Sequence, residues 1–229
     1  MNALREALER VFRQPVDFAG AGRTDSGVHA RGQVAHVRLQ RAVNIPPASL
    51  LQELNAALPA DIAALRLEPA HLQFHARHDA ISRAYVYQIA RRKTAFDKKF
   101  VWWIKEALDI DAMQEAARMI PGRHDFRHFQ AIDSSKPRES SVVVVEKAFF
   151  EPREDLLLFH IEAWHFLWRM VRRITGVLVH VGLRDLTPHD FQALLNPKLP
   201  PKVDIAAWTA PASGLFLQDV HYRNQKPAR

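Results

Sequence analysis

A cluster of glycines near the amino terminus constrains the fold more than any other feature of this sequence. Half of the chain's eight glycines fall close together: Gly20, Gly22, Gly27 and Gly32. Strand-like runs precede and follow the cluster, at residues 16–19 and 33–39. Glycine permits turns that side chains obstruct, so the pattern predicts a loop between two strands, displayed from the end of a sheet. Loops in this position commonly carry function.

Between the glycines, the loop carries four polar residues, Arg23, Thr24, Asp25 and Ser26. Asp25 by itself can be interpreted as a turn residue bonded to its own backbone, with Arg23 as a surface charge. A Walker loop ends in Gly-Lys-Ser/Thr, and a dinucleotide fingerprint places Gly-x-Gly-x-x-Gly before a helix; the segment matches neither pattern. What remains is a carboxylate that follows a guanidinium in a loop able to approach a ligand closely.

The residues around Asp25 resemble a known catalytic motif. Gly22-Arg-Thr-Asp-Ser-Gly-Val-His29, with Gly32-Gln-Val-Ala-His36 after it, is similar to the active-site motif of the TruA family of tRNA pseudouridine synthases. Further blocks resemble that family in the same order: Asn55-x-x-Leu-Pro59, Phe74-His-Ala-Arg77, Arg83-Ala-Tyr-Val-Tyr87, Gly122-Arg-His-Asp-Phe-Arg-His-Phe129, Phe166-Leu-Trp-Arg-Met-Val-Arg-Arg-Ile174 and Ala210-Pro-Ala-Ser-Gly-Leu-Phe-Leu217. The resemblance extends from Val16 to Tyr222.

The resemblance implies an isomerase that needs no metal ion or redox cofactor. Making pseudouridine cleaves the bond from uracil N1 to the ribose, turns the base in place and rejoins it through C5. One carboxylate suffices, if it attacks the ribose C1′ or removes a proton from C2′. By the resemblance, Asp25 is this carboxylate, Arg172 is its partner, and Tyr85 stacks on the extruded uracil. We also expect the Tyr85 hydroxyl to move a proton, although Tyr85 without the resemblance is equally an ordinary core aromatic.

The other site residues are expected to contact RNA or the substrate. Arg23 is interpreted as filling the gap left by the extruded base. A later loop is interpreted as an RNA-contacting surface; its polar residues are His124, Arg127, His128, Lys136 and Arg138. On the helix that carries Arg172, Arg169 and Arg173 are interpreted as a solvated basic face. The complete predicted binding set is Arg23, Thr24, His29, Arg77, Arg83, Arg127, Arg138 and Leu215.

The order of elements predicts an α+β fold. We expect two pseudo-related halves, each an antiparallel-type sheet with helices on one side, forming a central mixed sheet with the active-site cleft between the halves. Residues 1–93 form the half with the Asp25 loop, and residues 94–229 complete the cleft and the RNA-binding surface. Helices are predicted at residues 3–13, after Pro46, at 111–120, at 167–181 and after Thr187, and further strands at residues 64–68, 83–90, 141–150, 156–163 and 214–222.

Composition narrows the class of partner. A net charge of +7 and a pI near 10.0 favour a polyanion such as tRNA. The chain has no cysteine, which excludes disulfides and Cys-based zinc sites. No apolar run approaches the roughly 20 residues that span a bilayer. We therefore expect a cytoplasmic protein with no membrane association, and the resemblance implies a homodimer that binds tRNA across both subunits, modifies uridines of the anticodon stem and loop, and needs no other protein partner.

Two alternative functions remain open. Family members usually place a strand and a turn rich in glycine and aromatic residues before the first helix, and no residues here correspond to them. This departure keeps open a catalytically impaired protein that binds tRNA. The second alternative is a metal-dependent nuclease built on His71, His75 and His78. Strand-like residues surround these histidines, so no metal site is predicted.

Overall fold

The computed structural model describes residues 2–132 and 140–223. The chain divides into two compact units, residues 1–22 with 34–79, and residues 23–33 with 80–229. The expected division after residue 93 does not coincide with this one. The Asp25 loop and the strand at residues 80–90 both belong to the second unit, because they pair with strands from the end of the chain.

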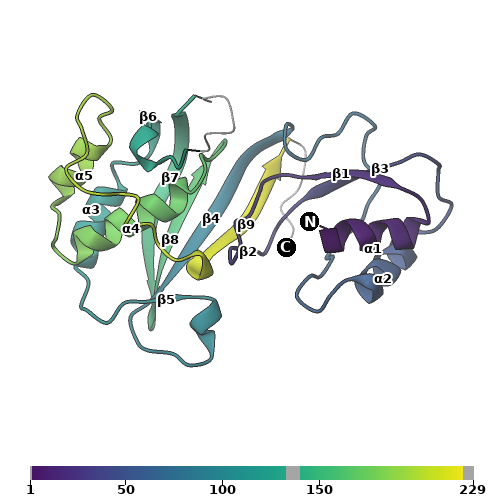
Figure 1. The fold of residues 1–229 in the computed structure, drawn as a ribbon, viewed down its shortest axis with the longest axis horizontal. Coiled ribbons are helices and arrows are strands. Elements are labelled where there is room, and N and C mark those ends of the chain that lie inside the picture. Colours follow the sequence, from purple (N-terminus) through teal and green to yellow (C-terminus); the bar gives the residue numbers. More distant parts are fainter. Residues whose placement is uncertain (1, 133–139, 224–229) are drawn as a thin grey trace. The chain divides into compact units, whose positions relative to one another are not determined.

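The first unit is a two-stranded ribbon packed with two helices. Strands β1 (Val16–Gly20) and β3 (Ala35–Leu39) pair antiparallel. Helices α1 (Asn2–Phe12) and α2 (Pro47–Ala57) lie beside each other along this ribbon (Figure 1). Apolar residues one turn apart on each helix form the core with Phe18, and α2 begins with proline, which suits the first turn.

The strand predicted at residues 64–68 is wrong, because this segment has no regular structure. The side-chain amide of Asn55 instead takes up both backbone groups of Ala64. Its Nδ2 donates to the Ala64 carbonyl at 2.9 Å, and its Oδ1 accepts from the Ala64 N–H at 2.7 Å. A side chain thus satisfies the polar groups that a neighbouring strand would otherwise satisfy.

The second unit is built on a seven-stranded mixed sheet (Figure 1). The strand order is β2-β9-β4-β8-β7-β6, and β5 pairs with the far end of β4. The pairs β2–β9 and β4–β5 are parallel, and the others are antiparallel. The strands are β2 (His29–Ala30), β4 (Ala80–Ala90), β5 (Trp102–Trp103), β6 (Gly122–Asp125), β7 (Val142–Arg153), β8 (Leu156–Ala163) and β9 (Leu215–Tyr222).

Three α-helices contribute to the core on one face of this sheet: α3 (Ile110–Ala117), α4 (Met170–Gly182) and α5 (Pro188–Leu194). Alternate β4 residues, Tyr87 and Ile89, are fully buried on this face. The apolar stripe predicted for α4 is confirmed, with Ile174 and Leu178 fully buried. Thr187 caps α5 in a capping box, as its position before a proline predicted.

The predicted α+β class with a mixed sheet is therefore confirmed. The two sheets differ in size, with two and seven strands. The structural similarity expected between two halves, and the cleft expected between them, stay predictions. Short 3₁₀ turns at Asp97–Lys99, Arg127–Phe129 and Ala212–Gly214 complete the fold. Within the described residues, no helix has both the length and the apolar character needed to cross a membrane.

Candidate active site

The second half of the Asp25 loop pairs with a strand of the large sheet. His29 and Ala30 pair in parallel with Phe216 and Leu217 of β9, and the Arg31 N–H donates to the Leu217 carbonyl at 2.8 Å. The loop runs so close to β9 that a Cβ at Gly32 would lie 2.5 Å from the Gln218 carbonyl oxygen. These contacts make the loop part of the unit that carries the rest of the site.

A tight turn sets the direction of Asp25 within this loop. The Val28 N–H donates to the Asp25 carbonyl at 3.0 Å, and Gly27 has a φ of 81°, in the left-handed region that side chains disfavour. The glycine requirement that the sequence suggested is thus confirmed at Gly27 and Gly32. Arg23 and Thr24 are exposed just before Asp25.

Two side chains hold the Asp25 carboxylate, one on each oxygen. Arg172 Nη1 lies 3.3 Å from Oδ2, and Trp168 Nε1 donates to Oδ1 at 3.2 Å. The Arg172 and Asp25 side chains are 15% and 29% exposed, so this ion pair is only partly screened by solvent. The contact expected between Asp25 and Arg172 is present, and the catalytic role of the pair stays a prediction.

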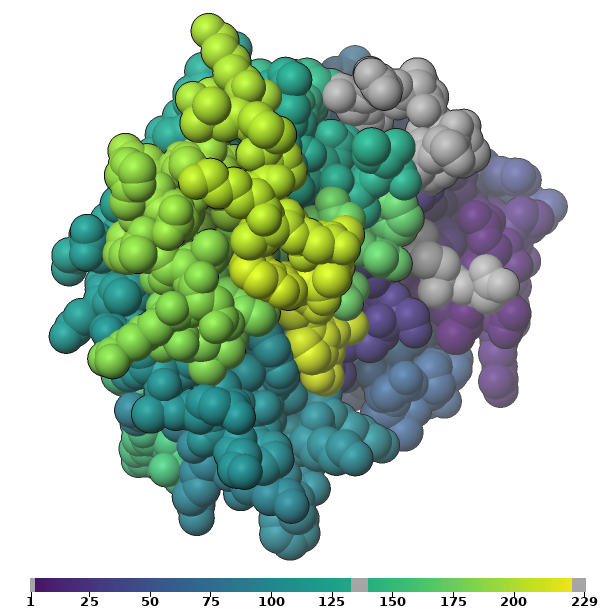
Figure 2. All heavy atoms as spheres, turned by 60° about the vertical axis from the view of Figure 1, so that its left-hand side comes forward, coloured from purple at the N-terminus to yellow at the C-terminus, as the bar shows by residue number. Residues whose placement is uncertain are grey.

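A segment before β9 fixes Arg172 in turn. Arg172 Nε donates to the Ala210 carbonyl at 2.8 Å, and the Ala210 N–H donates back to the Arg172 carbonyl at 3.1 Å. The next carbonyl, that of Pro211, accepts from the buried Tyr87 hydroxyl at 2.7 Å. This segment belongs to the yellow-green to yellow band that crosses the surface in Figure 2, and we call residues 203–211 the strap.

Tyr85 lies on β4, two residues before Tyr87, and its ring meets the edge of Phe166 at 5.0 Å between centroids. Burial raises the pKa of Tyr85 to about 12; the charge of Arg83 opposes the shift and the charge of Asp25 adds to it. The phenol therefore stays protonated at neutral pH. A partly buried neutral phenol can donate a hydrogen bond and offer a flat face to a base.

Three residues of the predicted binding set have side chains that bond to or pack against other parts of the protein. The Arg83 guanidinium is buried and donates to the Trp164 carbonyl at 2.5 Å. The His29 ring stacks on Phe216 and bonds through Nε2 to the Lys99 carbonyl. Leu215 is 6% exposed and belongs to the core.

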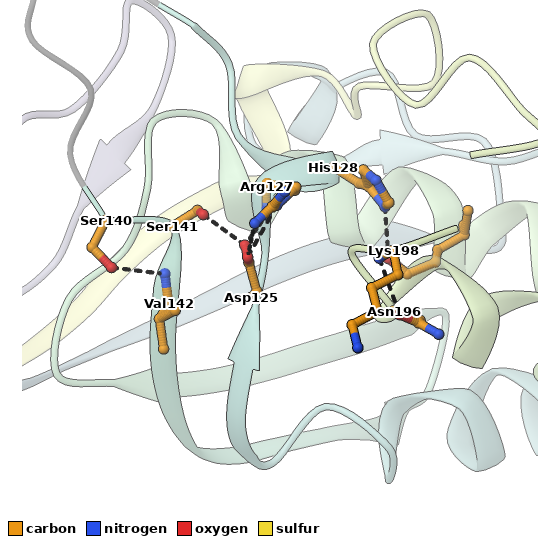
Figure 3. A network of polar contacts seen from close by, with 9 residues as sticks. Asp125, Arg127, His128, Ser140, Ser141, Val142, Asn196 and Lys198 are labelled. Atoms are coloured by element: carbon orange, nitrogen blue, oxygen red, sulfur yellow. Dashed lines mark hydrogen bonds and ion pairs between the residues drawn. The ribbon is translucent and has the colours of Figure 1, made fainter. Parts of the chain in front are cut away.

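The basic loop near β6 forms its own polar network (Figure 3). Arg127 is exposed and bonds to Asp125 through both Nε and Nη2, and Ser141 donates to the same carboxylate at 2.6 Å. The side-chain bond from Arg127 holds the pKa of Asp125 below its ordinary value. His128 bonds to the Leu194 carbonyl at 3.1 Å, and Lys136 and Arg138 lie outside the described residues.

The expectation of a solvated basic face is wrong for one residue of α4. Arg169 is exposed, with its guanidinium 4.9 Å from the Trp168 ring, as expected. Arg173 instead turns inward, donates to the Gln130 carbonyl, and keeps its Nε buried with no hydrogen-bond partner among the described residues. Desolvation lowers the pKa of Arg173. Arg173 is therefore only partly exposed, because its guanidinium bonds to a backbone carbonyl of a distant segment.

Arg77 and the histidine cluster belong to the first unit. Arg77 is exposed. The Nδ1 atom of His75 faces the backbone N–H groups of Arg77 and His78, at 3.2 Å and 3.4 Å. Across residues 2–132 and 140–223, no three His, Asp or Glu side chains come together as metal ligands.

Sequence reasoning missed two residues that complete the site. Trp168 was quoted only as part of a motif, and Ala210 only as the start of another. The available signal for Trp168 was its place in the same block as Arg172; it lies in a turn before α4, so helical spacing does not account for its direction. No sequence signal predicts the Ala210 contacts, because they use backbone atoms.

The sequence of this chain is similar to known proteins over most of its length. The family model described as tRNA pseudouridine synthase matches residues 1–79 and 116–223. The chain belongs to the TruA family of tRNA pseudouridine synthases. The matched residues include Asp25, Trp168 and Arg172, and they leave out Tyr85.

Individual members of the TruA family are similar in sequence to this chain over nearly its whole length. The tRNA pseudouridine synthase A of Dictyoglomus thermophilum is 36% identical over 221 residues, which cover 96% of this chain and 88% of that protein. The protein of the same name from Thermotoga maritima is 36% identical, over 95% of this chain and 87% of its own length. That of Treponema denticola is 36% identical, over 96% of this chain and 80% of its own length.

Proposed function

We propose that this chain converts uridine to pseudouridine in the anticodon stem and loop of tRNA, with Asp25 as the carboxylate that acts on the ribose. Family membership carries the assignment of a tRNA uridine isomerase. The choice of the anticodon arm, the homodimer and the residue roles are proposals that rest on the resemblance of the motifs.

The observation that supports this proposal best is the environment of Asp25. A partly buried carboxylate carries a guanidinium on one oxygen and an indole N–H on the other, and the partly buried Tyr85 has a pKa raised by burial and, to a smaller extent, by the charge of Asp25. Both donors favour the charged form, which either attack on C1′ or removal of a C2′ proton requires. The same carboxylate in an ordinary turn would bond to its own backbone.

Each of the other residues has a distinct task in the proposed reaction. Arg172 keeps the Asp25 charge in place through a side chain fixed to Ala210. Tyr85 stacks on the uracil after it leaves the RNA helix, when the base must turn to present C5 to the ribose. Exposed Arg23 and Thr24 contact the RNA beside the extruded base. The phenol of Tyr85, neutral at pH 7, donates to or exchanges a proton with the uracil as it turns.

The net charge of +7 supports a polyanionic partner. The exposed Arg127 and, in the first unit, the exposed Arg77 are proposed to contact RNA as well. Arg138 is proposed as a further RNA contact from the resemblance alone. A homodimer would place two copies of this surface on one tRNA. We propose a cytoplasmic location, where the substrate is found.

The experiment that tests the function is pseudouridine mapping in transcribed tRNA incubated with the protein. Wild type should form pseudouridine in the anticodon arm. Asp25→Asn keeps the size of the side chain and removes its charge, so product should vanish while tRNA affinity changes by less than about tenfold, or 1.4 kcal/mol. Asp17→Asn, at an exposed position of β1, is the matched control and should behave as wild type.

Turnover by Asp25→Asn would refute the assignment of the carboxylate. Wild-type protein that binds tRNA tightly but forms no pseudouridine would favour the alternative of a catalytically impaired tRNA-binding protein. Activity that a chelator abolishes would point to the metal-dependent class that the sequence left open.

A further inference from the structure

The two donors on Asp25 come from the same short stretch of chain, but they are held very differently. Arg172 carries a charge, is 15% exposed and is fixed a second time by the Ala210 carbonyl at 2.8 Å. Trp168 is neutral and 43% exposed, with its indole N–H 3.2 Å from Asp25 Oδ1. A charged, doubly held donor is costly to remove, whereas a neutral donor at the surface is not.

The backbone around Trp168 fixes where its ring can be. The Trp168 carbonyl accepts from the Ala131 N–H at 2.9 Å. The next residue, Arg169, has a φ of 59°, a left-handed conformation that is strained for a side chain other than glycine. This kink precedes the first turn of α4 and directs the indole back toward Asp25, while the Arg169 guanidinium lies 4.9 Å from the ring.

We propose that Trp168 is a positioning residue that aligns the Asp25 carboxylate in the free enzyme and releases Oδ1 to the incoming uridine. The inference rests on the function proposed for Asp25. A carboxylate held only by Arg172 through Oδ2 can rotate about its Cβ–Cγ bond, and a second donor on Oδ1 fixes the plane. Oδ1 is then the oxygen that contacts the sugar, because the Trp168 indole can leave Oδ1 while Arg172 remains bonded to Oδ2.

The first test removes the indole N–H and keeps an aromatic ring. Trp168→Phe should lower the single-turnover rate about 3- to 30-fold, the range expected for one hydrogen bond to a partly exposed charge. The tRNA dissociation constant should stay within about twofold. The acid limb of the pH–rate profile should move to higher pH, because the carboxylate loses a donor that favours its charged form.

The protein offers a matched control at Trp103. This tryptophan is also half exposed, at 40%, and lies beneath a cation in the same way, with Lys93 Nζ 5.5 Å from its ring. Trp103→Phe should leave the rate and the pH profile unchanged. An unchanged rate and pH profile in Trp168→Phe would overturn the inference.

A second test separates the N–H from the shape of the ring. Benzothienylalanine at position 168 replaces the N–H by sulfur and keeps the bicyclic ring, so it should reproduce the pH shift of Trp168→Phe; wild-type behaviour would refute the inference. In NMR spectra, the indole N–H resonance of Trp168 should move in Asp25→Ala, and an unmoved resonance would also refute it. Turnover by Asp25→Asn would overturn the function proposed for Asp25, and the inference with it.

Discussion

A single methyl group added at Gly176 should loosen the whole active site. Gly176 lies on the buried side of α4, one turn after Arg172, where the strap crosses the helix. A Cβ there would lie 1.7 Å from the Trp208 carbonyl oxygen and 2.8 Å from its carbon, distances that real contacts do not allow. In Gly176→Ala, the strap must therefore retreat by more than about 1 Å, and Ala210 moves with it.

The expected loss of stability in Gly176→Ala combines three contributions. Overpacking of this kind costs about 1–3 kcal/mol. The two hydrogen bonds between Ala210 and Arg172 contribute about 1 kcal/mol each, and alanine gains about 1 kcal/mol over glycine inside a helix. The variant should thus be destabilised by about 2–4 kcal/mol. For a chain of this size 1 kcal/mol corresponds to about 2–4 °C, so Tm should fall by about 4–16 °C.

Activity should fall further than the loss of stability explains. Well below the lowered Tm, the Gly176→Ala protein is folded, but Arg172 has lost the anchor on its Nε. A misplacement of about 1 Å can slow a reaction by about 10²-fold. We therefore expect the single-turnover rate for pseudouridine formation to drop by about 10- to 100-fold, measured beside the Tm from calorimetry.

Gly182→Ala is the control, because it adds the same methyl group to the same helix. Its Cβ would meet the flexible end of the Met113 side chain, 2.5 Å from the sulfur, and methionine can move aside. This variant should lose less stability than Gly176→Ala and keep its rate. Equal rates in both glycine variants would refute the argument that the strap positions Arg172.

Three further predictions concern single side chains. Arg172→Met should slow turnover and move the acid limb of the pH–rate profile upward, with Arg172→Lys intermediate because lysine keeps the charge but not the planar fork; a wild-type profile in both variants would exclude the pairing with Asp25. Tyr85→Phe should bind tRNA normally and lose about 10²-fold in single-turnover rate, the low end for proton transfer because its pKa of about 12 makes the phenol a weak acid; a rate within about threefold of wild type would leave it a stacking platform only. Asp125 has a lowered pKa, so its stabilisation is present above its ordinary value of 3.8 and is lost as the pH falls through the lowered one; the Tm values of wild type and Asp125→Asn should differ at pH 7 and converge in acid, and a difference that persists in acid would refute this.

Patterns local to the chain were predictable because they depend on neighbours in the sequence. The apolar stripe of α4, the cap at Thr187 and the long strands β7 and β8 follow from side-chain spacing and backbone preference. The glycines at positions 27 and 32 signalled a tight turn and a close approach, and both are present. The Asp25 motif was recognisable because its residues are contiguous.

The prediction failed where a distant group satisfied the backbone or buried a charge. Residues 64–68 carry a strand pattern, yet Asn55 takes up the backbone groups of Ala64. Arg173 has the position of a surface charge on a helical wheel, yet its guanidinium donates a hydrogen bond to the backbone carbonyl of Gln130. Neither partner can be recognised from the segment itself, because both contacts are set by packing.

The sequence alone was enough to indicate the α+β class and the family, and it predicted the carboxylate at position 25, because these depend on patterns of residues close together in the chain. The tertiary structure decided which atoms meet that carboxylate. Asp25 and Trp168 are 143 residues apart in the chain. They come together because β2 pairs with β9, and because the strap that precedes β9 packs against α4. Such meetings depend on backbone hydrogen bonds and close packing between distant segments, which no local pattern of side chains encodes.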